Sequence, residues 1–550
     1  MTENGWKNKL YYGDNLFVMR EYIADELVDL IYLDPPFNSD ASYNVLFKEH
    51  DGAAAAAQIK AFEDTWRWDE NAVRTYEEAV ERDGRLADVL VAFRKMLGDS
   101  NMMAYIAMMA PPLLEMRRVL KPAGSIYLHC DPTASHYLKM LLDAVFGPRL
   151  FVNEIIWKRI SAKGLAFTRF ARDHDVILRY AKGEGWKWNP QYISHDAEYI
   201  RKFYKYVDSE TGRRYRLADL TNPNKNRPHL TYEFLGVKRV WRWTKERMLE
   251  ARKKGLIFQK EPGAVPALKR YLDEQEGTPV DDIWLDIVPI QASSAERLGY
   301  PTQKPVALLE RIVRASSNEG DLVFDPFCGC GTTIDAAQKL GRRWIGIDIT
   351  HLAISLIRHR LRDTYGEEIE CGYQVIGEPT SVPDARVLAE QDPFQFQWWV
   401  LSLVGARPAE QKKGADKGID GRLYFHIGGK HETQQVIISV KSGKPNNAHV
   451  RELFAVVTRE GAALGALISM HAPTKPMRAE AAEAGTFESP WGKHAKIQIL
   501  TISDLLHGKK IDMPRTAGTN VTFKKARRRQ GDGGEQLVLR EEAAEYGTVE

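Results

Sequence analysis

The sequence has few cysteines and no long apolar run. Four cysteines in 550 residues are too few to build a disulfide framework for a chain of this size. They are Cys130, Cys328, Cys330 and Cys371. The longest purely apolar run, residues 102–114, is too short to cross a bilayer and contains Pro111 and Pro112. Because the N-terminal segment also has no apolar signal core, we expect a cytoplasmic protein without a membrane partner.

The sequence also has little net charge for its length. The formal net charge is only +3, but the charge is unevenly distributed. Residues 157–270 contain 27 Lys and Arg against 12 Asp and Glu. The length and the 44% hydrophobic content predict several globular domains, because single cores rarely grow past about 300 residues. We therefore expect a basic block within a multi-domain protein.

Strand and helix patterns alternate on both sides of this basic block. Before it, the predicted elements are strands at 28–33 and 125–129 and a mainly helical region at 51–120. After it, they are helices at 306–316 and 332–340 and strands at 322–324 and 344–347. This alternation predicts an α/β fold in which one doubly wound sheet is assembled from both segments. The basic block is then an insertion.

A glycine-rich loop follows the predicted strand at 322–324. It reads Asp325-Pro326-Phe327-Cys328-Gly329-Cys330-Gly331-Thr332-Thr333, and Asp348 follows 23 residues after Asp325. An acid at about this distance accepts hydrogen bonds from ribose hydroxyls in nucleotide-binding sheets, so an adenosine-containing cofactor fits. A glycine loop alone is equally typical of a structural turn, and no Walker lysine follows it. Without further thiols or imidazoles nearby, Cys328 and Cys330 are small loop residues rather than zinc ligands.

The segment Asp34-Pro35-Pro36-Phe37 stands at the carboxyl end of the predicted strand at 28–33. The Asp34 side chain and the Pro35 carbonyl are two acceptors beside an aromatic ring. Such a set suits a planar amine: gripping its two N–H bonds draws the nitrogen toward tetrahedral geometry and frees its lone pair to attack an electrophilic methyl group. Taken alone, these four residues are also typical of an ordinary turn at a strand end.

These motifs together resemble those of the β-group of amino-methylating DNA methyltransferases. In that family an Asp-Pro-Pro-Phe/Tyr loop precedes an Asp-Pro-Phe-x-Gly-x-Gly loop, with a target-recognition region between them, and this sequence has the same order. It also contains the family's opening Gly13-Asp14-Asn15-Leu16 and the segment Tyr300-Pro301-Thr302-Gln303-Lys304-Pro305, which closes over the cofactor in that family. The resemblance covers roughly residues 8 to 360.

The resemblance implies specific roles for the motif residues. Asp34 and Pro35, with Pro36 and Phe37, would form the catalytic loop, with Phe37 stacked on a base flipped from double-stranded DNA. The residues implied to bind S-adenosylmethionine are Gln303, Lys304, Asp325, Pro326, Phe327, Gly329, Gly331, Thr332 and Asp348, the last on the ribose. The aspartate in the catalytic loop usually accompanies adenine N6 in this family, whereas cytosine N4 is the alternative.

The basic insertion is also rich in aromatic residues. Its basic side chains would neutralise DNA phosphates, and the candidates are Arg213, Arg214, Lys238, Arg239 and Arg242. Charge runs are otherwise typical of solvated faces, and Trp241 and Trp243, two residues apart, are typical of strand core positions. For the insertion as a whole, the sequence favours DNA recognition.

The sequence after about residue 385 predicts a compact α/β domain with a buried helix at 394–404 and strands at 436–440 and 462–469. Asp420, Ser439 and Lys441 resemble the Asp…(Glu/Gln)-x-Lys core of Mrr-like restriction endonucleases, in which acids hold Mg²⁺ and the lysine helps to activate water. Ser439 leaves that site one ligand short, although Glu410 could compensate. An active nuclease, a degenerate DNA-binding module and an unrelated α/β fold all remain open.

We therefore predict a DNA methyltransferase with a C-terminal nuclease-like domain. The predicted domains are a catalytic half at 1–156, a target-recognition insertion at 157–295, a cofactor half at 296–375, a restriction-endonuclease-like domain at 385–512 and a disordered tail at 513–550. The alternatives are a bifunctional restriction and modification protein, a binding protein that has lost the chemistry, and an enzyme acting on RNA. A homodimer and a partner restriction subunit are open.

Overall fold

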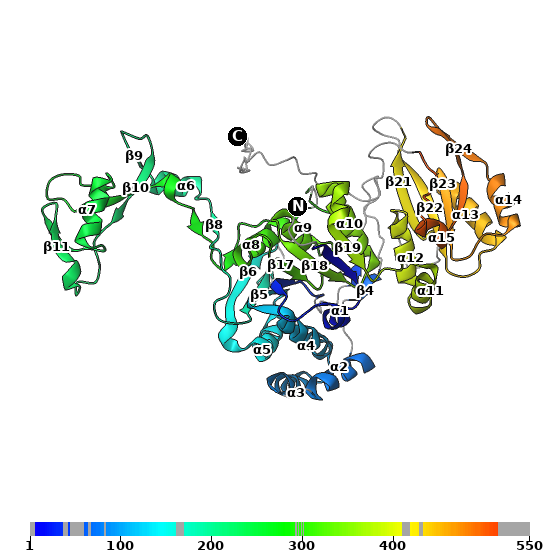
Figure 1. The fold of residues 1–550 in the computed structure, drawn as a ribbon, viewed down its shortest axis with the longest axis horizontal. Helices are drawn as coiled ribbons and strands as arrows, with labels where there is room; N and C mark the ends of the chain where they lie inside the picture. The colour runs from blue at the N-terminus through cyan, green and yellow to red at the C-terminus, as the bar shows by residue number, and fades with distance from the viewer. Residues whose placement is uncertain are drawn as a thin grey trace, which may run out of the picture. The chain divides into compact units, whose positions relative to one another are not determined.

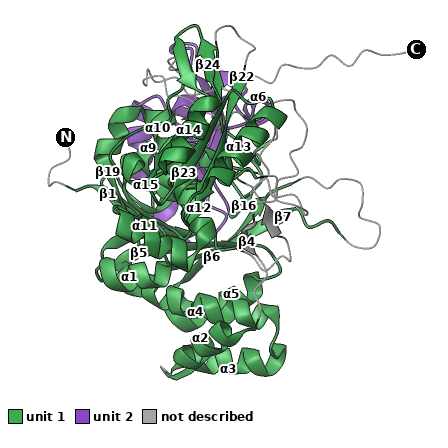
Figure 2. Cartoon of the chain, turned by 90° about the vertical axis from the view of Figure 1, so that its right-hand side faces the viewer, with its two compact units in different colours: residues 1–189, 282–550 green, residues 190–281 purple. Residues whose placement is uncertain are grey.

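The computed structural model describes most of the chain. The described residues are 6–36, 68–81, 84–160, 170–291, 294, 296–298, 300, 302–409, 418–427 and 433–514, with the backbone of the short strands β3 (Ser42–Asn44) and β4 (Lys60–Glu63). They divide into two compact units, one of residues 1–189 and 282–550 and the other of residues 190–281. Figure 2 colours these units green and purple.

The first unit contains a nine-stranded sheet that draws strands from both sides of residues 190–281. Its order is β16 (Ile283–Trp284), β6 (Phe151–Lys158), β7 (His174–Ala181), β5 (Leu120–Cys130), β2 (Val28–Leu33), β17 (Leu322–Asp325), β18 (Arg343–Asp348), β1 (Asn8–Tyr12) and β19 (Tyr373–Ile376). All neighbours pair in parallel except β7, which is antiparallel to both β5 and β6. The predicted single doubly wound sheet is therefore confirmed.

Helices cover both faces of this sheet (Figure 1). On one side lie α1 (Asn15–Tyr22), α4 (Asn101–Val119) and α5 (Ser135–Phe146), and on the other α8 (Val306–Ser316), α9 (Thr332–Lys339) and α10 (His351–Tyr365). The central strand β2 is buried along its whole length, as expected for a strand covered on both faces.

The region at 51–120 that was predicted to be mainly helical contains three helices where it is described. They are α2 (Glu70–Glu81), α3 (Arg85–Leu97) and α4, which continues through Pro111 and Pro112. The strand predicted at 125–129 is longer: β5 begins at Leu120, and residues 121–124, whose Pro and Gly are typical of a turn, are part of it. Turn residues did not end this strand because its Leu120 pairs with Val28 ahead of a register shift.

The second sheet of this unit lies in the C-terminal region. Its order is β20 (Arg407–Pro408), β21 (Gly421–His426), β22 (Thr433–Lys441), β23 (Leu464–Ser469) and β26 (Ile497–Thr501). Around it are α11 (Val382–Gln391), α12 (Pro393–Leu403), α13 (Asn447–Arg459), α14 (Lys475–Glu483), α15 (Ile502–Leu506) and the hairpin β24 (Thr486–Ser489) and β25 (Gly492–Ala495). The predicted buried helix and the two predicted strands are thus present as α12, β22 and β23.

The unit of residues 190–281 has its own small core. A four-stranded sheet has the order β13 (Ile257–Phe258), β14 (Ala267–Tyr271), β10 (Arg214–Asp219) and β9 (Tyr206–Val207). Beside it stand α6 (Ala197–Phe203), α7 (Lys245–Lys253) and the hairpin of β11 (Thr231–Phe234) and β12 (Val237–Val240). The core residues are Leu220, Phe234, Val237, Trp241, Met248 and Leu268.

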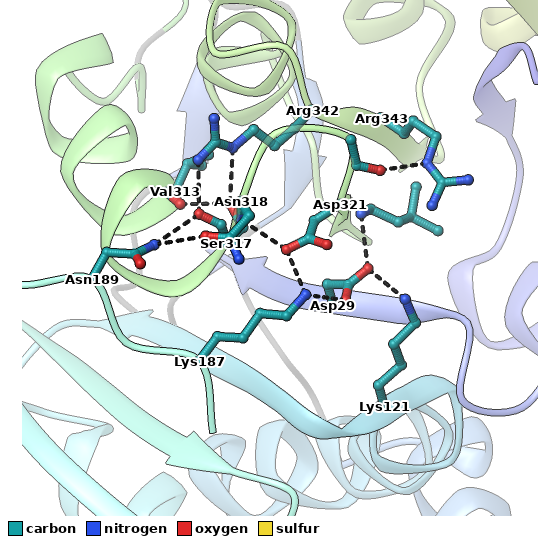
Figure 3. Close-up of polar contacts among 12 residues, drawn as sticks. Asp29, Lys121, Lys187, Asn189, Val313, Ser317, Asn318, Asp321, Arg342 and Arg343 are labelled. Carbon is teal, nitrogen blue, oxygen red and sulfur yellow. Dashed lines mark hydrogen bonds and ion pairs between the residues drawn. The ribbon is translucent and has the colours of Figure 1, made fainter. Parts of the chain in front are cut away.

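A buried carboxylate fixes the amino end of the central strands (Figure 3). Asp29, whose side chain is 3% exposed, accepts hydrogen bonds from Lys121 Nζ at 2.7 Å, Lys187 Nζ at 2.8 Å and the Leu322 backbone N–H at 3.0 Å. Lys187 also pairs with Asp321 at 2.6 Å. Burial alone would raise the pKa of Asp29, but these bonds hold it below its usual value. One side chain therefore joins β2, β5, β17 and the segment that leads into the insertion.

Replacing Asp29 should destabilise the protein strongly. Asp29→Ala leaves two lysines and a buried N–H group without their shared acceptor, so we expect the free energy of unfolding to fall by about 3 kcal/mol. The matched control is Asp25→Ala, because Asp25 pairs with Arg118 at the surface and its side chain is 73% exposed. The control should cost less than about 1 kcal/mol. Chemical denaturation measures both, and equal losses would contradict this role of Asp29.

Candidate active site

The catalytic-loop and glycine-loop motifs meet at one edge of the sheet. Strands β2 and β17 are parallel neighbours, with Leu30 opposite Val323, so the loops after their carboxyl ends lie side by side. A cavity of about 400 Å³ opens there. It is lined by residues 13–16, Tyr32, Asp34, Pro35, Pro36, Thr75, Met108, Met109, Pro111, Pro112, Tyr300, Thr302, Gln303, Lys304, Leu309, Asp325, Pro326, Phe327, Cys328, Gly329, Cys330, Thr332, Thr333 and residues 348–350. The two motifs thus share one cavity. Phe37 lies outside the described residues.

The glycine loop needs its glycines for conformation and for close packing. Gly329 and Gly331 have φ angles of +49° and +75°, which L-residues with side chains rarely adopt. A Cβ on Gly331 would stand 2.7 Å from Ile357 Cγ1 in α10. The loop then enters α9 directly, with Gly331 at the N-terminal cap position. Its backbone can therefore approach a ligand closely.

Asp348 closes the far side of the loop. Its Oδ2 accepts the Gly329 N–H at 2.9 Å, and its Oδ1 accepts the Thr350 N–H at 2.9 Å and the Thr350 hydroxyl at 2.8 Å. Burial raises the pKa of Asp348 to about 6 against the effect of these bonds. The sequence predicted this acid directly after the strand at 344–347, and the structure places it in the cavity wall.

Asp325 is a second buried acid in the same wall. It is 3% exposed and accepts the Phe327 N–H at 3.0 Å. Burial raises the pKa of Asp325 to about 7 against the lowering effect of the bonds from Thr333 and Phe327, and the nearby carboxylates of Asp34 and Asp348 add to the rise. Asp325 and Asp348 are thus two buried acids in the wall of one cavity, and a cationic ligand beside them would favour their ionised forms.

Asp34 makes an ion pair that the sequence did not predict. Its Oδ2 lies 2.5 Å from Lys304 Nζ, although the two residues are 270 positions apart. Gln303 supports this arrangement: its Oε1 accepts the Leu298 N–H at 2.8 Å, and its Nε2 donates to the Glu296 carbonyl at 2.7 Å. Gln303 therefore braces the segment that carries Lys304 to the catalytic loop.

The sequence analysis did not predict one wall of the cavity. Met108, Met109, Pro111 and Pro112 of α4 supply it, with Thr75 of α2. The signal was the pair of prolines inside an apolar helix, because prolines cannot donate to the carbonyls one turn earlier. The buried polar residues Tyr32, His129 and Asp175 were also missed, since their partners stand on different strands.

The insertion places its predicted DNA-binding residues in different settings. Arg213 is held by Asp273 at 2.7 Å and 2.9 Å and by Glu274 at 2.7 Å. Lys238 and Arg239 are exposed on β12, and Arg214 is exposed at the start of β10. Arg242 is exposed too, and its Nε donates to the Thr221 carbonyl at 2.9 Å. Of the aromatic pair, Trp241 is fully buried in the unit's own core, as typical of a strand core position.

The carboxylate of Asp420 in the C-terminal region already accepts hydrogen bonds from protein donors. Asp420 Oδ2 accepts the Val440 N–H at 2.6 Å and the Ser439 hydroxyl at 3.2 Å, and Asp420 Oδ1 accepts Gln397 Nε2 at 3.2 Å. Lys441 Nζ lies 4.0 Å from Asp420. In the described residues, which do not include Glu410, no group of three or more His, Cys, Asp or Glu could hold a metal ion. None of the described helices combines the length and apolar character needed to cross a membrane.

The C-terminal region is similar to a family of inactive nucleases. Residues 394–507 match the family described as NACHT-associated inactive Restriction Endonuclease 1. This match supports the predicted restriction-endonuclease-like fold. It does not identify the domain as Mrr-like, and it does not support the predicted Mg²⁺ site.

The larger part of the chain is similar to known DNA-modifying enzymes. The chain is 30% identical over 358 residues to the Type II methyltransferase M.EcaI of Enterobacter cloacae, which covers 64% of this chain and 69% of that protein. It is 25% identical to the Type III restriction-modification enzyme StyLTI Mod subunit of Salmonella typhimurium, over 71% of this chain and 58% of that protein. It is also 25% identical to the DNA adenine methyltransferase YhdJ of Escherichia coli, over 64% of this chain and 82% of that protein. Residues 28–358 match the N6/N4 family described as DNA methylase, and because this match exceeds half of the chain, the chain belongs to that family.

Proposed function

We propose that this DNA methylase transfers a methyl group from S-adenosylmethionine to the N6 amine of adenine in double-stranded DNA. The observation that carries the proposal is the single cavity shared by Asp34, the Pro35 carbonyl and the glycine loop. The two acceptors for an amine and the predicted cofactor loop stand at one sheet edge, which is what direct transfer between two bound reactants requires.

The residues of the cavity fit S-adenosylmethionine. When bound, this cofactor supplies an electrophilic methyl group on a cationic sulfonium. Asp325 and Asp348 supply negative charge when ionised, and Gly329 allows the loop its positive φ angle of +49°. The Asp348 carboxylate is the acceptor that we assign to the ribose hydroxyls, because it stands at the end of β18 beside the loop.

The catalytic loop orients the amine. Asp34 and the Pro35 carbonyl accept the two N–H bonds of the amine, so its lone pair is directed away from its own ring. Lys304 holds the carboxylate of Asp34 in place, because its ammonium group lies 2.5 Å from Asp34 Oδ2. A carboxylate, unlike a carboxylic acid, offers only acceptors to the amine.

Adenine is the preferred target in this proposal. The aspartate at position 34 is the form that usually accompanies adenine N6 in the β-group, and YhdJ, to which the chain is similar, is named a DNA adenine methyltransferase. Cytosine N4 is the competing target, because the same two acceptors suit its amine. The insertion at 157–295 is the proposed target-recognition region.

A nuclease activity is a weaker second candidate. The carboxylate of Asp420 already accepts bonds from protein donors, and the similar family is described as inactive. We therefore favour a degenerate module over a bifunctional restriction and modification protein. The similarity to a Mod subunit of a restriction-modification enzyme supports a partner restriction subunit as part of the proposal.

Asp34→Ala tests the proposed chemistry. We expect wild-type protein to incorporate tritiated methyl groups into duplex DNA that contains adenine, and the variant to lose at least about a hundredfold in rate because one amine acceptor is gone. The variant should still bind DNA. Asp88→Ala, at an exposed position in the first turn of α3, should retain full rate. Nuclease digestion of the product and chromatography separate N6-methyladenine from N4-methylcytosine, and methylcytosine as the product would refute the adenine assignment.

Cofactor affinity should rise with pH. In the free protein the raised pKa values of about 6 for Asp348 and about 7 for Asp325 mean that both acids are largely protonated at pH 5. A cationic ligand favours their ionised forms, so binding releases protons, and affinity should increase up to about tenfold per pH unit for each proton released, levelling off above about pH 7. Titration calorimetry in buffers of different ionisation enthalpy measures both quantities. Asp348→Asn should remove the component near pH 6, whereas an affinity independent of pH would contradict the assignment.

The insertion should contribute to DNA binding through Lys238 and Arg239. Replacing both by alanine should reduce the slope of log affinity against log salt by about one to two units if both contact phosphate. Lys254→Ala is a suitable control, because Lys254 is exposed in the same unit but already pairs with Glu250 at 2.9 Å. Fluorescence anisotropy at several salt concentrations gives the slopes. An unchanged slope in the double variant would place DNA on a different surface.

A further inference from the structure

Three buried polar side chains form a hydrogen-bonded chain that the proposed function does not use. Tyr32 Oη lies 2.8 Å from His129 Nδ1, and His129 Nε2 lies 3.1 Å from Asp175 Oδ2. They stand on the adjacent strands β2, β5 and β7, and each is at most 2% exposed. Because β7 is antiparallel to β5, Asp175 near its beginning lies at the same edge as His129 near the end of β5. All three side chains therefore lie at the sheet edge where the catalytic-loop and glycine-loop motifs meet.

The network assigns one direction to these hydrogen bonds. Burial alone would raise the pKa of Asp175, but the bond from His129 and the charges of Lys304 and Arg159 hold this pKa below its usual value. Asp175 is therefore an ionised acceptor. His129 then donates from Nε2–H, and its Nδ1 accepts the Tyr32 hydroxyl proton. Burial lowers the pKa of His129, which favours this neutral form.

The chain reaches the proposed amine-binding loop. Tyr32 lies in β2 two residues before Asp34, which follows the end of this strand, and both residues line the cavity. On the other side, the Trp157 ring packs edge-on against His129 at 5.9 Å, and Trp157 Nε1 donates to the Ile287 carbonyl at 2.9 Å. The fixed hydroxyl of Tyr32 therefore has little freedom to move.

Such a chain is costly for stability alone, because apolar residues of similar volume would avoid the desolvation of Asp175 and His129. We propose that Tyr32, held by His129 and Asp175, is a positioning residue for methyl transfer. It fixes the end of β2, and with it the orientation of the Asp34 carboxylate and the Pro35 carbonyl toward the target amine. This inference rests on the proposed function of that same site.

The adjacent strand offers a matched control for Tyr32. Tyr127 is the register partner of Tyr32, and the two residues are 1% and 2% exposed, respectively. The Tyr127 hydroxyl lies 2.7 Å from Ser316 Oγ, but Tyr127 does not line the cavity. Tyr32→Phe and Tyr127→Phe each remove one buried hydroxyl from a central strand. We expect similar losses of thermal stability. Only Tyr32→Phe should lower kcat, by about 10- to 100-fold, while KM for DNA and for S-adenosylmethionine changes less than about twofold.

A second pair of variants separates hydrogen bonding from packing at His129. The amide of His129→Asn reaches the position of Nδ1 and can accept from Tyr32, whereas His129→Leu fills similar space without an acceptor. We expect the asparagine variant to keep several-fold more of the wild-type kcat than the leucine variant.

The outcomes distinguish this inference from the function on which it rests. An active wild type with Tyr32→Phe at full kcat would overturn the positioning role and leave the proposed function standing. Equal kcat losses in Tyr32→Phe and Tyr127→Phe would also overturn it, because a general structural effect would then explain both. A wild type that transfers no methyl group to DNA would overturn the proposed function and the inference together.

Discussion

The site depends on the parallel pairing of β2 with β17 across the insertion. Leu30 pairs with Val323, and Asp29 accepts the Leu322 N–H from 293 positions away. This pairing brings the loop after Leu33 and the loop after Asp325 to the same edge. Lys121 and Lys187 hold the amino end of the same strands through Asp29. The register at one end of the sheet therefore determines the distance between the proposed amine acceptors and the proposed cofactor loop at the other end.

Electrostatics gives this edge its chemical character. Asp325 and Asp348 have raised pKa values because burial disfavours their charge, and a cation bound beside them would favour their ionised forms near neutral pH. Asp34 differs because Lys304 already pairs with it. One acid of the cavity is thus neutralised by the protein itself, and the other two are left for a ligand. This difference between the acids fits the two reactants that we propose, a neutral amine at Asp34 and a cationic methyl donor at the glycine loop.

Much of this arrangement could be predicted from local sequence. The run at 28–33, the glycines of the loop and the acid at 348 each carry a local signal, because burial, positive φ angles and strand ends constrain residue type. The pairs Asp34–Lys304 and Tyr32–His129 could not be predicted in the same way, because their partners are brought together only by sheet order. Residues 121–124, whose Pro and Gly are typical of a turn, do not end a strand for a similar reason: pairing with β2 extends β5 through them.

The C-terminal domain has a structural role that does not depend on cleavage. Its helix α12 contributes Phe396 and Trp399 to a core that also contains Leu352 and Leu356 of α10, the helix that follows Asp348. Gln395 Oε1 accepts the N–H of His351, the first residue of α10, at 3.2 Å. Removing the domain would expose this apolar face and free the amino end of α10. A nuclease-like fold whose Asp420 accepts its hydrogen bonds from Val440, Ser439 and Gln397 can therefore still pack against α10, because this packing does not depend on cleavage.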